Sequence, residues 1–322
     1  MSSPRRVRWG ILGCGSIASS AIAPAIRWSA NGELVAVGSR SLDRARERAH
    51  AVGAARAHGD YASLLADADV DAIYIGLPNG EHARWAIAPA EAKKHVHCGK
   101  SLALSLDDAL AMREAFRARG LRLVEGFMVR HHPQWELARR LAGDIGRVRV
   151  VRAWLSGTLA DPGNHRFSRE LGGGALFDVT CYAVNAARLL IGEEPVRALA
   201  TARWLGHGVD EATHALLEFP GGAVAEVSGS LASPFEQAVV VTGERGRLVL
   251  DRPFVPAWDP VEVVVEVDGR RQSHAVGGAN HFLHMIEHVG RLVQDPSAPA
   301  WPAEDGVANV AALCAIADAA AR

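Results

Sequence analysis

Short apolar runs alternate with longer amphipathic stretches over the first 124 residues. The runs have the length of buried strands and stand at 7–12, 33–37, 72–77, 95–98 and 121–124. The stretches between them show helical spacing and lie at 17–28, 41–52, 79–94 and 105–119. Because this alternation is typical of βαβ units, we predict an α/β domain with a doubly wound parallel sheet over residues 1–124.

After Gly126 the apolar runs lie closer together, and turns such as Pro220-Gly221-Gly222 separate several of them. These runs stand at 148–156, 196–204, 213–219, 223–229, 237–242, 247–250 and 261–267. Helical spacing recurs at 135–142, 174–191, 281–294 and 303–320. We therefore predict a second domain over 125–322, of α+β type, with an open, mostly antiparallel sheet arranged as a meander. The last helix is expected to be able to pack back on the first domain.

Length and charge agree with two folded domains and exclude several classes of protein. The chain has 322 residues, and one hydrophobic core rarely serves more than about 250–300. Lys plus Arg number 35 and Asp plus Glu 36, so a net charge of −1 provides no general attraction to nucleic acid or to a membrane surface. No apolar run approaches the roughly 18 residues of a membrane span, and the first residues show no signal-peptide pattern.

The cysteines and one group of histidines argue against a metal site. The cysteines are far apart and form no CxxC pair; they are Cys14, Cys98, Cys181 and Cys314. This spacing predicts reduced thiols in a cytoplasmic protein and speaks against a structural zinc. His281, His284 and His288 share a predicted helix, but no carboxylate or Cys joins them at ligand spacing, so we expect no metal.

The loop after the first apolar run has the pattern of a dinucleotide-binding turn. It reads G-x-G-x-x-A from Gly13 to Ala18 and opens a predicted helix. Gly13 allows a tight turn, Gly15 lets the backbone approach a pyrophosphate, and Ala18 permits close helix–strand packing. The amide groups at the helix start, at Ser16 and Ile17, would face the phosphates. The alternative is a glycine turn that binds nothing, but its position inside a βαβ unit favours the cofactor.

The end of the second apolar run indicates which dinucleotide is bound. An NAD-binding unit usually has an acidic residue there to bind the ribose 2′-hydroxyl, whereas this chain has Ser39 and Arg40. A serine hydroxyl and a guanidinium suit the 2′-phosphate of NADP(H) instead. Alternatively, Arg40 only caps an exposed helix start.

A stripe of polar side chains crosses an otherwise apolar helix at 174–191. Asp178, Tyr182 and Asn185 fall at i, i+4 and i+7, on one face. Apolar residues all around the helix predict that it is buried, and a buried carboxylate is costly unless it is paired or functional. The alternative is that Asp178 caps a neighbouring turn and Tyr182 is an ordinary core aromatic.

These motifs resemble those of the Gfo/Idh/MocA (glucose–fructose oxidoreductase) family, and the resemblance extends over nearly the whole chain. It is carried by the blocks at 10–18, 70–86, 93–105, 125–134 and 172–195. The last block is most similar to the subgroup of dimeric dihydrodiol dehydrogenases and NADP-dependent D-xylose dehydrogenases. The resemblance implies a Rossmann domain, a second open-sheet domain, and nicotinamide-dependent oxidation or reduction of a sugar, keto-sugar or cyclic diol.

Two positions depart from the family pattern. The family usually reads Glu-Lys-Pro where this chain has Gly99-Lys100-Ser101, so the lysine stands without its usual neighbours. Thr180 replaces the glycine that is usual in the subgroup, while Tyr182 agrees with the subgroup and differs from the histidine of the broader family.

Oxidation of an alcohol needs a base for the hydroxyl proton, and the reverse reaction needs an acid. A tyrosine titrates near 10, and a neighbouring ammonium group lowers that pKa. We assign Tyr182 as the proton donor and acceptor, with Lys100 as its electrostatic partner and a ligand of the substrate oxygen; either group could carry the proton. Asp178 would orient substrate hydroxyls. Asn185 and Arg130 are further substrate candidates, although Arg130 could equally form an interdomain ion pair.

The loop after the fourth strand of the Rossmann pattern is the remaining cofactor candidate. By family analogy, Leu77, Pro78 and Asn79, with His82 one turn into the helix, flank the nicotinamide ribose together with Lys100. Asn79 could instead serve only as a helix cap.

Two other functions compete with an NADP(H)-dependent dehydrogenase. A non-catalytic dinucleotide sensor is weakly favoured by the altered Gly99-Lys100-Ser101 segment, but retention of Lys100 and Tyr182 argues against it. An oxidoreductase that retains its cofactor and cycles between two sugars would need an N-terminal arm, whereas about six residues precede the first strand. The expected partners are a small-molecule substrate and further copies of the chain, in a homodimer or homotetramer formed through the second-domain sheet.

Replacing Arg40 by alanine is expected to weaken NADP(H) binding far more than NAD(H) binding, because only NADP(H) has the phosphate that the guanidinium would contact. Loss of one charge-assisted contact corresponds to about 1.5–3 kcal/mol. Titrating both cofactors against both proteins measures this. Equal losses for the two cofactors, or a wild-type preference for NAD(H), would contradict the assignment.

Overall fold

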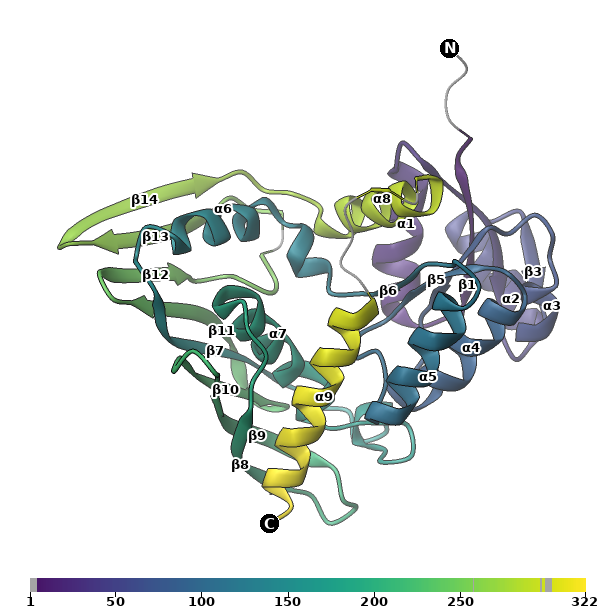
Figure 1. Ribbon diagram of the computed structural model, residues 1–322. Helices are drawn as coiled ribbons and strands as arrows, with labels where there is room; N and C mark the ends of the chain where they lie inside the picture. Colours follow the sequence, from purple (N-terminus) through teal and green to yellow (C-terminus); the bar gives the residue numbers. More distant parts are fainter. Residues whose placement is uncertain (1–4, 257, 296, 299–302) are drawn as a thin grey trace. The chain divides into compact units, whose positions relative to one another are not determined.

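The computed structural model describes residues 5–256, 258–295, 297–298 and 303–322 (Figure 1). Contacts divide the chain into two units, one of Met1–Met128 with His281–Val307 and one of Val129–Asn280 with Ala308–Arg322. We call them the Rossmann unit and the second unit. This division differs from the predicted boundary, which placed all of 125–322 in the second domain.

The Rossmann unit contains a sheet in which all paired strands are parallel, as predicted. Its strands are β1 (Val7–Leu12), β2 (Gly32–Gly38), β3 (Arg56–His58), β4 (Ala72–Ile75), β5 (His95–Cys98) and β6 (Leu123–Glu125). Their order is β3-β2-β1-β4-β5-β6, so the direction of winding reverses between β1 and β4. Doubly wound folds bind ligands at the carboxyl ends of the strands at this reversal.

Short helices connect these strands. They are a π-helical segment (Ala18–Ile22) continued by α1 (Ala23–Trp28), α2 (Leu42–Val52), α3 (Tyr61–Leu65), a 3-10 turn (Asn79–Glu81), α4 (His82–Glu91) and α5 (Leu106–Arg117). Ser105 caps α5 by accepting a hydrogen bond from the amide of Asp108 at 3.1 Å. The sequence pattern did not predict β3 or α3, because the three polar-flanked residues of β3 form no apolar run.

Helix α8 (His281–Gln294) belongs to the Rossmann unit although it follows the second unit in the chain. It packs beside α1 and against β1 and β2 (Figure 1). Its apolar face joins the core through Met285, Ile286 and Val289, which cluster with Trp9 and Ile26. The amphipathic spacing predicted the helix correctly, but an apolar face alone does not identify the surface that it covers.

The second unit contains a mostly antiparallel sheet, as predicted. Its strands are β7 (Val148–Thr158), β8 (Arg197–Trp204), β9 (Asp210–Glu218), β10 (Val224–Ser230), β11 (Ala232–Gly243), β12 (Gly246–Leu250), β13 (Val261–Val267) and β14 (Arg270–Val276). The order β14-β13-β12-β11-β7-β10-β9-β8 corrects the predicted simple meander, because β7 lies between β10 and β11 and runs parallel to β10. Strand β14 was missed because its sequence is almost entirely polar.

Helical segments complete the second unit. They are a 3-10 turn (Met128–His131) that enters the unit, α6 (Pro133–Ala142), a 3-10 turn (His165–Phe167), a π-helical segment (Leu176–Thr180) continued by α7 (Cys181–Ile191), and α9 (Ala303–Ala320) from Ala308 onward. Of these, α6, α7 and the π-helical segment before α7 contact the sheet. The segment at Leu176–Ile191 contacts β7 and β10; α7 is almost completely buried, whereas Phe177, Asp178 and Val179 before it are partly exposed. The first turn of α9 remains in the Rossmann unit, where Gly306 lies close to the Leu102 side chain.

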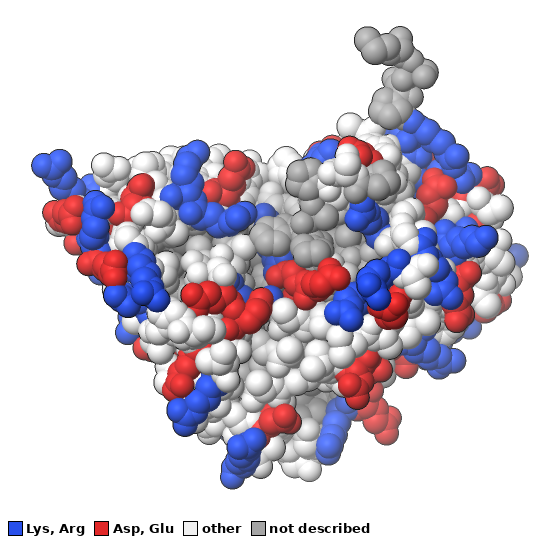
Figure 2. Space-filling view, in the orientation of Figure 1, with Lys and Arg blue, Asp and Glu red and all other residues white. Residues whose placement is uncertain are grey.

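Charges of both signs are interspersed over the face of the molecule shown in Figure 2, in keeping with a net charge of −1. No helix in the described part of the chain is long and apolar enough to cross a membrane.

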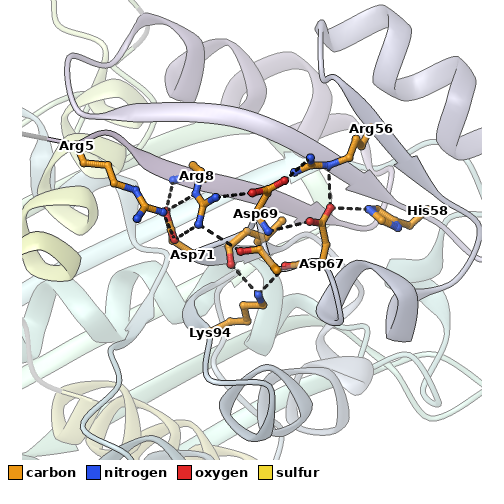
Figure 3. A network of polar contacts seen from close by, with 10 residues as sticks. Arg5, Arg8, Arg56, His58, Asp67, Asp69, Asp71 and Lys94 are labelled. Atoms are coloured by element: carbon orange, nitrogen blue, oxygen red, sulfur yellow. Dashed lines mark hydrogen bonds and ion pairs between the residues drawn. The ribbon is translucent and has the colours of Figure 1, made fainter.

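An ion-pair network closes the amino-terminal edge of the Rossmann sheet (Figure 3). The Asp71 carboxylate accepts hydrogen bonds from the Arg8 amide at 2.9 Å and from Arg8 Nη2 at 2.8 Å. Asp69 joins Arg8 to Arg56, with N–O distances of 2.7 and 2.8 Å. The buried Lys94 ammonium donates to the carbonyl oxygens of the same loop at Asp67 and Val70. The network therefore ties the loop before β4 to β1 and β3.

Replacing Asp71 by asparagine should lower the free energy of unfolding by about 1.5–3 kcal/mol at neutral pH, since it removes charge-assisted hydrogen bonds from a partly buried guanidinium. Burial alone would raise the pKa of Asp71, but the Arg8 hydrogen bonds and charge outweigh it and hold the pKa below its usual value. A depressed folded-state pKa contributes stability that is present above the unfolded pKa, near 3.9, and is lost as pH falls through the folded value.

Urea unfolding of wild type and Asp71→Asn from pH 7 to pH 3 measures this, and the difference should shrink as the pH falls below about 4. Asp43→Asn is the matched control, because Asp43 is exposed and makes only a 3.9 Å pair with Arg46. Equal effects of the two substitutions would show that the network contributes nothing specific.

Candidate active site

The glycine turn after β1 passes against the end of β4. Gly13 has a φ of +103°, and a Cβ there would lie 2.8 Å from the carbonyl oxygen of Gly76, closer than any side chain allows. The Gly13 amide is held by the carbonyl of Gly38 at the end of β2, at 3.0 Å. Gly15, Ser16 and Ile17 follow on the surface, where the next helix begins. A tight glycine turn that leads to exposed residues at the start of a helix fits the pyrophosphate of a dinucleotide.

Ser39 and Arg40 stand at the end of β2, next to this turn. The Ser39 amide donates to the His58 carbonyl at 3.0 Å, which fixes the backbone, and the side chain of Arg40 is exposed. Burial raises the pKa of Tyr61, and the positive charge of Arg40 opposes that rise, so the guanidinium lies near Tyr61. Ser41 occupies the N-cap position of α2 without a side-chain cap hydrogen bond.

His82 connects the loops that follow β4 and β5. Its Nδ1 lies 2.8 Å from the Ser101 carbonyl oxygen and its Nε2 lies 2.9 Å from the Leu77 carbonyl oxygen. Only 1% of the residue is exposed, and burial lowers the pKa of its imidazole. Both ring nitrogens are thus turned toward the protein backbone. His82 therefore contacts the loops after β4 and β5. That it also lies beside the cofactor stays a prediction from the family resemblance.

Lys100 lies in the loop after β5, which is held although its neighbours are not the usual Glu and Pro. The Gly99 amide donates to the Ile75 carbonyl at 3.1 Å, and the Leu102 amide donates to the Glu125 carboxylate at 2.7 Å. Ser101 is fully buried and Lys100 is half-buried. Glu125 was not identified from the sequence; an acidic residue at the end of a buried strand, directly before Gly126, was the available signal.

Leu77, Pro78 and Asn79 follow β4 and are half-buried. Asn79 begins the 3-10 turn that precedes α4. The predicted cofactor residues therefore lie together at the carboxyl ends of β1, β2, β4 and β5 in the Rossmann unit.

The predicted polar stripe lies on the π-helical segment and α7 of the second unit. π-Helical turns inside helices are frequent at functional sites. The side chain of Asp178 is 19% exposed, whereas Tyr182 is 8% and Asn185 1% exposed. The stripe therefore runs from the surface into the interior, and the Tyr182 ring packs 5.7 Å from that of Phe254.

Asn185 and Arg130, both predicted to meet substrate, are joined to each other. Arg130 Nε donates to Asn185 Oδ1 at 2.8 Å. Asn185 Nδ2 lies 3.4 Å from Asn309 Oδ1, which also accepts a hydrogen bond from the buried Arg188 at 3.1 Å. Arg188 is in turn paired with Glu194 at 2.6 Å. These contacts give Asn185 a place in a buried polar network that links α7 to α9.

Asp178 forms an ion pair with Arg166, a residue to which the sequence analysis assigned no role. Arg166, in the 3-10 turn before the glycine run, donates from Nε to Asp178 Oδ2 at 2.7 Å. Asp178 therefore does more than cap a turn, because its carboxylate is paired with a guanidinium. In the described residues, no three His, Cys, Asp or Glu side chains are placed to hold a metal ion.

Comparison with known proteins identifies the class. Residues 7–127 match the oxidoreductase family with an NAD-binding Rossmann fold, and residues 137–249 match the Gfo/Idh/MocA C-terminal domain. The chain belongs to the Gfo/Idh/MocA family of oxidoreductases, which confirms the resemblance seen in the sequence blocks.

Named relatives cover nearly the full chain. A D-xylose 1-dehydrogenase (NADP(+)) of Haloferax volcanii is 36% identical, over 96% of this chain and 95% of its own. A trans-1,2-dihydrobenzene-1,2-diol dehydrogenase of Danio rerio is 31% identical, over 88% and 84%. The crystal structure of a 3-ketoreductase from Actinomadura kijaniata, in complex with NADP and TDP-benzene, superposes with a TM-score of 0.90 at 29% identity and covers 98% of both chains.

Proposed function

We propose that the protein is an NADP(H)-dependent oxidoreductase that interconverts a CH–OH group and a carbonyl group on a sugar, keto-sugar or cyclic diol. The observation that carries the proposal is that Lys100 and Tyr182 are both retained on firmly held elements, Lys100 in a loop tied by three hydrogen bonds and Tyr182 on a buried helix. The named relatives act on substrates of these kinds.

The Rossmann unit contains the residues that would hold the cofactor. The turn at Gly13 and Gly15, with the helix amides at Ser16 and Ile17, fits the pyrophosphate, and Ser39 with Arg40 fits an adenosine 2′-phosphate. The solved ketoreductase and the xylose dehydrogenase are named with NADP, in agreement with this choice. Bound NADP(H) would supply the acceptor or donor of the hydride.

The protein's own groups would move the proton. In the oxidising direction Tyr182 accepts the hydroxyl proton as the carbon loses its hydride, and in the reducing direction it returns a proton to the carbonyl oxygen. Lys100 stabilises the phenolate and binds the reacting oxygen. Asp178 accepts a hydrogen bond from a neighbouring substrate hydroxyl, and the Arg166 guanidinium stabilises the ionised form of its carboxylate.

We further propose that the outer face of the second-unit sheet pairs with that of another copy, in a homodimer or homotetramer. Helix α7 packs on one face of β7 and β10. A shallow hollow of about 600 Å³ on the sheet is lined by the apolar Trp154, Leu199 and Leu216 and by polar side chains such as Arg152, His214 and Glu226. Leu199 is 46% exposed, although it is a large apolar side chain that a partner surface would cover. Exposed apolar side chains on a sheet face that also carries polar ones favour pairing with a second protein surface. A cytoplasmic location stays a prediction from the cysteine spacing.

Replacing Tyr182 by phenylalanine should lower turnover by about 10²–10⁴ while leaving NADP(H) binding nearly intact. Lys100→Ala should be at least as damaging, and the double variant should lose far less than the sum, since both groups act on one oxygen. A panel of sugars and dihydrodiols with NADP⁺, followed by nicotinamide absorbance, provides the substrate and the rates.

Tyr74→Phe is the matched control, because Tyr74 lies in β4, where its ring packs against His97. Normal turnover of Tyr182→Phe would reduce Tyr182 to a packing residue and leave Lys100 or another group as the acid. Tight NADP(H) binding with no turnover across the panel would replace the enzyme by the dinucleotide sensor.

Light scattering at micromolar concentration should give an even multiple of the 34.2 kDa chain. Leu199→Glu should shift the protein toward the monomer, because it replaces an exposed apolar side chain of the paired face by a carboxylate. Leu106→Glu is the control, since Leu106 is similarly exposed but lies at the start of α5 in the Rossmann unit. A wild-type monomer would refute the assembly.

A further inference from the structure

The ion pair between Arg166 and Asp178 lies at the outer end of the polar stripe. Arg166 Nε donates to Asp178 Oδ2 at 2.7 Å, and the two side chains are 32% and 19% exposed. Tyr182 follows Asp178 by one turn and is 8% exposed. Exposure therefore falls from Arg166 to Asp178 to Tyr182, so a substrate that reaches the Tyr182 phenol from solvent along this stripe passes the guanidinium.

The backbone around Arg166 is fixed to a degree that a surface ion pair does not require. The Asn164 carboxamide accepts a hydrogen bond from the Arg166 amide at 3.1 Å, and the Arg166 carbonyl accepts one from the Gly174 amide at 2.9 Å. A Cβ on Gly173 would lie 2.2 Å from that carbonyl oxygen, so only glycine permits this contact. The close contacts of Gly173 and Gly174 thus allow the Arg166 turn to pack directly against the start of the helix that carries Asp178.

The same glycines are anchored from the other side. Asp210 is buried and accepts hydrogen bonds from the Leu176 amide at 2.7 Å and from the Thr213 hydroxyl at 2.6 Å. A Cβ on Gly174 would collide with the Asp210 carboxylate, at 2.0 Å. The turn, the glycine run and the first π-helical turn therefore form one packed unit that sets the position of the guanidinium.

The guanidinium keeps donors for a ligand. Nε is used by Asp178, and Nη1 lies 3.5 Å from Asn164 Oδ1, the limit of a hydrogen bond. Among the described residues Nη2 has no hydrogen-bond partner, and the Arg166 side chain is 32% exposed, so its two N–H groups remain available as donors. Asp178 neutralises the charge, so the pair offers donors beside an acceptor, an arrangement that suits neutral, hydroxyl-rich molecules better than a lone cation would.

We propose that Arg166 is a substrate-recognition residue that donates to a substrate oxygen beyond the reacting carbon and its neighbour. The proposal rests on the proposed function and narrows its substrate class. A pyranose or other polyhydroxylated substrate has such a third oxygen, whereas a dihydrodiol of a hydrocarbon ring has only the two vicinal hydroxyls, which Tyr182 and Asp178 would occupy. The Arg166–Asp178 pair therefore selects sugars over cyclic hydrocarbon diols.

The test compares wild type, Arg166→Ala and Arg166→Lys with D-xylose, its monodeoxy analogues and trans-1,2-dihydrobenzene-1,2-diol, all with NADP⁺. Arg166→Ala should lower kcat/KM for D-xylose by about 10- to 100-fold, the range expected for one charge-assisted hydrogen bond. It should lower kcat/KM for the diol by a smaller factor, because the diol loses only the charged partner of Asp178 and no hydrogen bond of its own. Arg166→Lys should recover part of the loss. Arg169→Ala is the matched control, because Arg169 is an exposed arginine of the same loop, and it should leave both substrates unchanged.

The deoxy sugars supply a readout that a structural role would not move. In wild type, removing the hydroxyl that Arg166 contacts should cost as much as Arg166→Ala, and in that variant it should cost nothing further. A uniform loss on xylose, its analogues and the diol would overturn the proposal, as would a wild type active on the diol alone. Wild-type inactivity on these compounds and across the wider panel of sugars and dihydrodiols would instead overturn the proposed function, together with the inference that rests on it.

Discussion

The close backbone approach at the carboxyl ends of β1 and β4 is the constraint on which the candidate cofactor site depends. Gly13 turns the chain within a distance of the Gly76 carbonyl that no side chain would allow. The helix after the turn then starts at the surface, with Ser16 and Ile17 exposed. Because parallel strands end at the same edge, this single turn fixes the place toward which the loops after β2, β4 and β5 are directed.

Those loops are connected to one another as well as to the sheet. The two ring nitrogens of His82 lie within hydrogen-bond distance of two backbone carbonyl oxygens, one in the loop after β4 and one in the loop after β5. Glu125, at the end of β6, accepts a hydrogen bond from the Leu102 amide. Lys100 directly precedes these two attachments and follows Gly99, whose amide donates to the Ile75 carbonyl. The neighbours that are altered relative to the family, Gly99 and Ser101, are therefore embedded in backbone hydrogen bonds that do not depend on their side chains.

In the second unit the corresponding constraint is the cost of burying polar groups on a helix that is apolar nearly all around. Each polar residue of the stripe has a different environment. Asp178 is compensated by Arg166, while Asn185 is compensated by Arg130 and by the network that reaches Asn309. Tyr182 lies between these two groups on the same face. The polar groups on either side of it are thus satisfied by the protein, which allows the stripe to persist inside a packed helix.

The sequence by itself determined the two-domain α/β architecture, the parallel sheet, the glycine turn and the helix at His281–Gln294, because each depends on local periodicity or local backbone freedom. The tertiary structure decided the features that depend on contacts between residues distant in the chain. Strands β3 and β14 are held by their neighbours rather than by apolar side chains, and β7 takes its place between β10 and β11 through pairings distant in the chain. The contacts of His82 and the pairing of Arg166 with Asp178 likewise arise from distances between loops, which no spacing along the chain encodes.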